Sequence, residues 1–175
     1  MTDYGLLAKQ IVSLAEVDAH CLPVLSNAAA LLWDALDDIN WAGFYLVDPV
    51  TVAGEGAELG VALSAPEPRT PELRLGPFQG KVACVRISFG RGVCGTAAAT
   101  KTSQLVEDVH QFPGHIACDS ASNSEVVVPI FKDGQVVGVL DIDSPNVARF
   151  TQEDLAGLEQ VVKALESCTN FSAFC

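Results

Sequence analysis

The stretch Glu125-Val-Val-Val-Pro-Ile-Phe-Lys-Asp-Gly-Gln-Val-Val-Gly-Val-Leu-Asp-Ile-Asp143 holds two alternating segments, 125–131 and 135–143, on either side of Asp133-Gly134. Alternation of apolar side chains with a period of two is typical of a strand with one buried face. Asp-Gly is favoured at two-residue turns between antiparallel strands. The stretch therefore predicts a β-hairpin, and the rest of the fold is expected to pack around it.

Three carboxylates lie in this apolar hairpin, namely Glu125 on the first strand and Asp141 and Asp143 on one face of the second. An ionised carboxylate among apolar neighbours is unfavourable unless it meets a cation or a donor, or keeps its proton. Three such groups in one pocket would raise at least one pKa and provide a proton donor near neutral pH. Alternatively, Asp141 and Asp143 merely end a strand before the turn at Ser144-Pro145.

A glycine-rich turn, Gly90-Arg-Gly-Val-Cys-Gly95, lies upstream of the hairpin and opens a short Ala-rich helix at 96–100. Its glycine spacing matches the dinucleotide-binding fingerprint. We reject that interpretation, because the fingerprint requires a parallel βαβ unit with a full crossover helix, and only about half a helix fits before the strand-like segment 104–106. A turn that closes over a pocket explains the same residues.

Three cysteines accompany these features: Cys84, Cys94 and Cys118. Cys118 lies in an irregular loop beside His115, and a nearby imidazolium would lower the pKa of its thiol. A zinc site could combine His110, His115 and Cys118 with Cys84 or Cys94, but the spacing fits no familiar zinc pattern. We therefore expect no metal, and a redox relay explains three separated cysteines beside carboxylates better.

The segment 40–46 also alternates, so that Trp41, Gly43 and Tyr45 would share one face of a strand. Two large aromatic residues that flank a glycine leave a hollow between them. The hollow could accept a ligand or be filled by ordinary core packing, and spacing alone favours neither.

Apolar residues at helical spacing predict a helix over 4–19, with Leu7, Ile11 and Leu14 buried, and a second helix after Pro23. Further elements are a last helix capped by Thr151, with Asp154 at N3, and strands at 72–75, 81–88 and 104–106. Helices at both ends of an antiparallel strand series predict one α+β domain spanning 1–175. Its twisted sheet carries the terminal helices on one face and a loop-covered pocket on the other. Residues 48–71 are read as a long surface loop, and 169–175 as a C-terminal tail.

Composition narrows the classes of function. The 175 residues are 49% hydrophobic, which excludes disorder, and 22 acids against 10 bases give a net charge of −12. That charge disfavours nucleic acid and anionic membrane surfaces as partners. Without an N-terminal targeting segment or a membrane-span pattern, a cytoplasmic location is expected, where thiols stay reduced. Cys21 is then interpreted as a small apolar residue.

Seven ordered blocks resemble one known family, the free methionine-(R)-sulfoxide reductases, which have a GAF fold. The blocks are Asn40-Trp-Ala-Gly-Phe-Tyr-Leu46, Gly76-Pro-Phe-Gln-Gly-Lys81, Ala83-Cys-Val-Arg-Ile87, Gly90-Arg-Gly-Val-Cys-Gly-Thr96, Gly114-His-Ile-Ala-Cys-Asp119, Ser122-Asn-Ser-Glu125 and Gly138-Val-Leu-Asp-Ile-Asp-Ser144. They run from the second helix to the last one and include all three central cysteines. The loop at 48–71 departs from the pattern, being longer and richer in Ala and Pro.

The resemblance implies an enzyme that reduces the R epimer of free methionine sulfoxide and binds no cofactor. It implies that Cys118 attacks the sulfoxide and becomes a sulfenic acid, which Cys84 resolves to a disulfide, with Cys94 as a second thiol. Thioredoxin would restore the dithiol, and a homodimer is possible. The chemistry assigns Glu125 and Asp143 as acids; these two residues and Asp141 also bind substrate, and the aromatic rings of Trp41 and Tyr45 hold its S-methyl end.

The main rival interpretation is a non-catalytic GAF domain that senses a small molecule, because many GAF folds bind ligands without catalysis. That class predicts a fused output domain and gives no reason for Cys84, Cys94 and Cys118 to occur together. A zinc-stabilised interaction module is a third possibility, and it predicts stoichiometric metal in the purified protein.

Overall fold

The computed structural model describes residues 2–48, 70–115 and 120–171 of the chain. Their strands form one six-stranded antiparallel sheet in the order β3-β2-β1-β6-β5-β4. The strands are β1 (Trp41–Val47), β2 (Glu72–Gly80), β3 (Arg86–Ser88), β4 (Gln104–Val106), β5 (Ser124–Lys132) and β6 (Gln135–Ser144). Most of the predicted loop 48–71 and of the predicted tail 169–175 lies outside the described residues.

The predicted hairpin forms, with β6 at the centre of the sheet and β5 beside it. β5 pairs with β6 along its whole length, placing Glu125 opposite Asp143 and Val127 opposite Asp141. Asp133 and Gly134 both have positive φ angles, 50° and 76°. This is the left-handed turn conformation that suits the twist of a hairpin, and Asp and Gly adopt it most readily.

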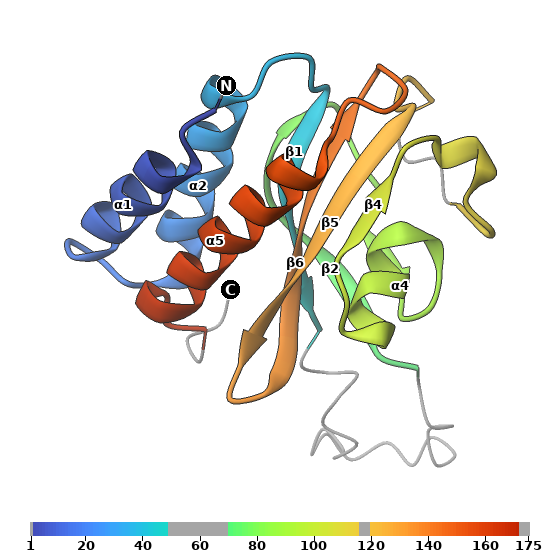
Figure 1. Ribbon diagram of the computed structural model, residues 1–175. Helices are drawn as coiled ribbons and strands as arrows, with labels where there is room; N and C mark the ends of the chain where they lie inside the picture. The colour runs from blue at the N-terminus through green and yellow to red at the C-terminus, as the bar shows by residue number, and fades with distance from the viewer. Residues whose placement is uncertain (1, 49–69, 116–119, 172–175) are drawn as a thin grey trace, which may run out of the picture.

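Helices cover the two faces of the sheet unequally (Figure 1). One face carries α1 (Tyr4–Ala15), α2 (Cys21–Ala35) and α5 (Gln152–Cys168), while α4 (Gly92–Thr100) lies on the other. A short 3₁₀ helix, η1 (Val109–Gln111), follows β4. No helix among the described residues has the length and apolar character needed to cross a bilayer.

Two apolar clusters follow from this arrangement. The larger lies between the three helices and the sheet, and includes Phe44, Leu140 and Ile142. The smaller lies under α4 and includes Trp41 and Tyr45. Alternate residues of β1 and β6 thus enter different clusters, as the period of two predicts, and the acids of β6 share the face of the smaller cluster. The α+β class and the helix-covered face are confirmed, whereas the other face is covered partly by a helix, α4.

The predicted helix boundaries need small corrections. α1 ends at Ala15, four residues early, and Leu14 is 42% exposed, because the buried stripe runs through Leu7, Ala8, Ile11 and Ala15. α2 begins at Cys21 and so contains Pro23 in its first turn, where a missing N–H costs no helical hydrogen bond. The capping box of Thr151 and Asp154 on α5 is confirmed.

Two predicted strands have different lengths. β2 continues through Pro77 to Gly80. Pro77 falls at the irregularity in the β1–β2 register between the pairs Gly43–Phe78 and Tyr45–Leu75, and β3 pairs only with Glu72–Arg74. The predicted strand 81–88 is reduced to β3, so residues 81–85, including Cys84, form a connecting segment. That segment is held near β2 by a hydrogen bond from Leu75 N–H to the Val85 carbonyl, 3.0 Å long.

The space beside Gly43 is filled by Phe78 of β2, which decides between the two interpretations of this position in favour of packing. Trp41 stacks on Phe78 with ring centroids 5.2 Å apart and on Tyr45 with centroids 5.7 Å apart. A Cβ added at Gly43 would overlap the Phe78 side chain and lie 2.8 Å from Trp41 Cη2. Glycine is therefore required here by close approach and not by its φ angle.

We expect Gly43→Ala to lower the free energy of unfolding by about 1–3 kcal/mol, since an extra methyl group would have to push Phe78 and Trp41 aside. Gly5→Ala is the matched control, because its added Cβ would meet nothing closer than 3.4 Å within α1. Replacing a helical glycine by alanine should stabilise by up to about 1 kcal/mol. Urea unfolding of both variants tests the pair, and a Gly43→Ala protein as stable as the parent would contradict this packing.

Candidate active site

A pocket opens on the sheet face beneath α4, at the centre of the strand order. Its described lining comes from β1, β3, α4, β5, β6 and the segments that precede β5. These residues are Tyr45, Ile87, Arg91, Gly92, Val93, Cys94, His115, Ser122, Glu125, Asp141 and Asp143. The three predicted acids, Tyr45 and Cys94 are therefore brought to one place, whereas Trp41 and Cys84 are not among the described lining residues and Cys118 lies outside the described residues.

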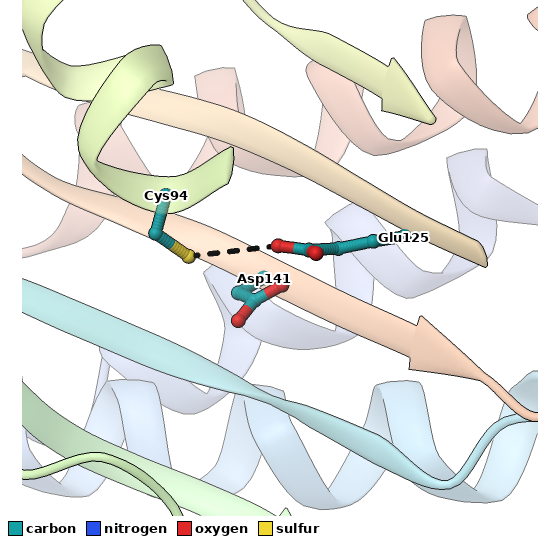
Figure 2. Close-up of side chains that lie close together, drawn as sticks. All are labelled: Cys94, Glu125 and Asp141. Carbon is teal, nitrogen blue, oxygen red and sulfur yellow. Dashed lines mark hydrogen bonds between the residues drawn. The ribbon is translucent and has the colours of Figure 1, made fainter. Parts of the chain in front are cut away.

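Cys94, Glu125 and Asp141 form a buried cluster in this pocket (Figure 2). Cys94 Sγ lies 3.9 Å from Glu125 Oε1, which accepts a long hydrogen bond from the thiol. Both carboxylates are only 6% exposed. Asp141 Oδ1 is buried and has no hydrogen-bond partner in the described structure. A buried oxygen without a donor is unfavourable, and this indicates a site adapted to a ligand and not to stability alone.

Burial controls the ionisation of all three groups. Loss of solvent raises the pKa of Glu125 well above its usual value, and the neighbouring charges of Asp141 and Asp143 raise it further. Burial also raises the pKa of Asp141, to about 6. The pKa of the Cys94 thiol is raised by burial and then by the same carboxylates. Burial therefore favours the neutral thiol of Cys94 and the protonated form of Glu125.

We expect Asp141→Asn to raise stability at neutral pH. The pKa of Asp141 goes from 3.8 to about 6 on folding, so the unfolded chain ionises first as pH rises. The contribution of Asp141 to the stability of the parent should decline between pH 3.8 and about 6, by up to about 3 kcal/mol. The Asn variant should lack this contribution and keep only the decline that the raised pKa of Glu125 causes. Thermal unfolding of both proteins from pH 3.5 to 8 tests the prediction, and parallel curves would contradict it.

His115 lines the same pocket. Its Nε2 lies 3.9 Å from Glu125 Oε2, at the mouth of the buried acids. Burial lowers the pKa of His115, so the ring is mainly neutral at pH 7. A neutral imidazole does not lower the pKa of a thiol as the predicted imidazolium would. Neither His110, which is exposed and bonds Asp108, nor His115 joins a cluster with metal-ligand geometry among the described residues.

The two aromatic residues predicted to bind substrate differ in position. Tyr45 lines the pocket, and burial followed by the charge of Asp141 raises the pKa of its hydroxyl far above the usual value. Trp41 is not among the described lining residues. It stacks behind Tyr45, and its Nε1–H donates to the Lys81 carbonyl over 3.2 Å. Trp41 therefore supports Tyr45 and the segment that carries Cys84.

The cysteines fall into two groups. Cys21 and Cys84 are disulfide-bonded, whereas Cys94 and Cys168 are free thiols. The interpretation of Cys21 as simply a small apolar residue is therefore wrong. Cys118, the predicted nucleophile, lies outside the described residues, so its role and its pairing with Cys84 stay predictions.

Sequence reasoning missed the part of the pocket built by the start of α4. Arg91 occupies the N-cap, and it makes no side-chain hydrogen bond to the helix end. Gly92 and Val93 place their backbone at the pocket wall. Free N–H groups and a guanidinium at a helix N-terminus form a site for an anion. The glycine-rich motif predicts a turn that closes over a pocket, but the sequence does not show that Arg91 lines that pocket.

Comparison with known proteins agrees with this architecture. A GAF domain family model matches residues 30–167. The chain is 48% identical over 163 residues to the free methionine-R-sulfoxide reductase of Escherichia coli (strain K12), covering 93% of this chain and 86% of the relative. The yeast (Saccharomyces cerevisiae) protein of the same name is 48% identical over 169 residues, with 93% and 83% covered. The X-ray structure of free methionine-R-sulfoxide reductase from Neisseria meningitidis in complex with its substrate is 41% identical, with a TM-score of 0.81 and coverage of 97% and 89%.

The sheet order and the pocket beneath α4 define a GAF-domain protein. Since identity of 48% extends over 93% of its length, the chain belongs to the free methionine-R-sulfoxide reductase family. The resemblance drawn from its seven sequence blocks is thereby confirmed.

Proposed function

We propose that this protein reduces the R epimer of free L-methionine S-oxide to methionine, with Cys118 as the nucleophile. The observation that supports this most directly is the burial of Glu125 and Asp141 together beside a pocket, which favours the protonated form of Glu125. Such an acid is what sulfoxide reduction by a thiol needs, because the sulfoxide oxygen is a poor leaving group until it receives a proton.

The proposed first half-reaction moves one oxygen atom. The Cys118 thiolate attacks the sulfoxide sulfur, Glu125 or Asp143 gives a proton to the oxygen, and the oxygen passes to the Cys118 sulfur. Methionine leaves, and Cys118 remains as a sulfenic acid. Glu125 and Asp143 are opposite each other on β5 and β6, so both acids can approach one oxygen atom.

The pocket carries acids in one part and a cationic side chain in another, which suits the two charged groups of a free amino acid. Asp141 and its neighbouring acids suit the ammonium group, and Asp141 Oδ1 is a buried acceptor with no donor in the described structure. Arg91 and the N-terminus of α4 suit the α-carboxylate. Tyr45 offers an aromatic face to the S-methyl group. A methionine sulfoxide inside a peptide has neither charge and should be a poor substrate.

The proposed second half-reaction restores the thiol. The Cys84 thiol condenses with the Cys118 sulfenic acid and releases water, and a dithiol protein of the thioredoxin type then reduces the disulfide. Cys84 is disulfide-bonded in this structure and lies between Val82 and Val85, which are 88% and 67% exposed. This position is open to an external reductant. Cys94 would serve as a second thiol, since its buried neutral form suits slow exchange better than attack. The cytoplasmic location predicted above would place the protein with such reductants.

The decisive experiment follows NADPH oxidation with thioredoxin, thioredoxin reductase and each separate epimer of free methionine S-oxide. Turnover of the R epimer is expected, with little for the S epimer or for the N-acetyl amide of the R epimer. Equal rates for the free and blocked R epimers would contradict the amino-acid recognition. Binding of free methionine S-oxide without turnover under any dithiol would favour the rival sensor interpretation. Sedimentation in the same buffer tests the proposed homodimer.

A further inference from the structure

The cluster that surrounds Asp141 Oδ1 has a second property, which reaction with a sulfoxide does not require. Cys94, Glu125 and Asp141 each offer one ligand atom, and these atoms all lie within 4.8 Å of one another. They come from α4, β5 and β6, and all three side chains point into one space (Figure 2). All three residues are buried in the sheet and its covering helix, so their positions are fixed by the fold.

A small cation would draw these atoms somewhat closer together. With Zn–S near 2.3 Å and Zn–O near 2.0 Å, a tetrahedral ion needs sulfur and oxygen ligands about 3.5 Å apart. Cys94 Sγ and Glu125 Oε1 are 3.9 Å apart, so a shift of a few tenths of an ångström closes that pair. Asp141 Oδ1, buried and without a donor, is the atom that gains most from a cation.

The ligand types select among cations. One sulfur and two carboxylate oxygens suit a borderline or soft ion, and three protein ligands with an open fourth position are typical of reactive zinc sites. Mg²⁺ and Ca²⁺ need six or more oxygen ligands, which a buried group of three donors with a sulfur does not supply.

We propose that Cys94, Glu125 and Asp141 form a binding site for a soft divalent cation, Zn²⁺ or Cd²⁺, and that the bound cation excludes methionine S-oxide from the pocket. The cation is an inhibitor here and not a cofactor, because it occupies the acid and the carboxylates that the proposed reaction uses. The inference goes beyond the proposed function, since zinc affinity can be measured without any turnover.

The test titrates the reduced full-length protein with Zn²⁺ against a chromogenic chelator. Cys94→Ser and Asp141→Asn should each weaken zinc binding by at least about 10-fold. Asp141→Asn keeps the test valid if Cys94→Ser does not fold, because loss of this buried carboxylate should stabilise the protein. Cd²⁺ should give the ultraviolet absorption of a cadmium–thiolate bond in the parent and in Cys168→Ser, but not in Cys94→Ser.

Cys84→Ser is the matched control for a different site made of exposed thiols. It should keep the parent zinc affinity. Loss of binding in Cys84→Ser with retention in Cys94→Ser would overturn the proposal, and so would equal affinity in all variants. Saturating methionine S-oxide should raise the apparent Kd for Zn²⁺, whereas millimolar Mg²⁺ should not. An apparent Kd unchanged by the substrate would overturn the shared pocket.

Discussion

Replacing Cys118 by serine is expected to lower kcat for free methionine (R)-S-oxide by about three orders of magnitude or more, because the nucleophile is removed. The serine hydroxyl is a far weaker nucleophile and cannot form a sulfenic acid. The measurement is NADPH oxidation coupled to thioredoxin, together with direct quantification of methionine. Substrate binding, measured by calorimetry, should persist, because the proposed partners of the ammonium and the α-carboxylate are Asp141 and Arg91.

Cys84→Ser separates the two half-reactions. This variant should release one methionine per protein chain and then recycle slowly, with Cys118 trapped by a reagent specific for sulfenic acids. Cys168→Ser is the matched control, since Cys168 is a free thiol on α5, on the sheet face opposite the pocket. Equal thioredoxin-linked rates in Cys118→Ser, Cys84→Ser and Cys168→Ser would remove the proposed mechanism.

The central hairpin was predictable because its signals are local. Alternation over β5 and β6 and the Asp133-Gly134 turn lie between Ser124 and Ser144, and each agrees with the other. The capping box of α5 is equally local. These features determine which face of the sheet carries Glu125, Asp141 and Asp143, so most of the candidate site could be deduced once the hairpin was recognised.

The contacts that sequence could not provide are made between distant segments. Phe78 fills the space beside Gly43, because β2 continues past Pro77 where the composition suggested a stop. Glycine and proline mark a turn in most contexts. Here β2 tolerates them, because β3 does not pair with this part of the strand. The approach of His115 to Glu125 depends on an irregular segment, which has no periodicity to place it. Cys94 was identified, but its close contact with Glu125 depends on how α4 crosses the sheet.

The same burial that destabilises the pocket prepares its chemistry. An ionised Glu125 would lie beside Asp141 and Asp143 without a paired cation among its described contacts, so the proton is retained well above the usual pKa of a glutamate. Ionisation of this group stabilises the unfolded chain, and the free energy of unfolding of the protein is lower as a result. A site selected only for stability would carry an amide or an apolar residue there.

Glu125→Gln is therefore the second change with a large expected effect. If Glu125 gives the proton to the sulfoxide oxygen, the amide variant should lose about 10²- to 10⁴-fold in kcat while keeping its fold. The direction in which the rate changes with pH follows from the role of Glu125 as proton donor. The parent rate should fall as pH rises through the raised pKa of Glu125, because only the protonated acid is active, and this alkaline limb should be missing in Glu125→Gln.

The matched control for that experiment is Glu159→Gln, a glutamate of α5 that accepts a hydrogen bond from Ser103 over 2.8 Å, outside the pocket. It should keep both the parent kcat and the alkaline limb. Asp143→Asn decides between the two candidate acids, since Asp143 lies opposite Glu125 across β5 and β6. If Asp143→Asn loses kcat and the alkaline limb while Glu125→Gln retains both, then Asp143 is the proton donor and the raised pKa of Glu125 serves substrate binding. Carboxylates this close titrate together. The apparent pKa of the alkaline limb is therefore a property of Glu125 and Asp143 together, whereas the loss of kcat identifies which of them donates the proton.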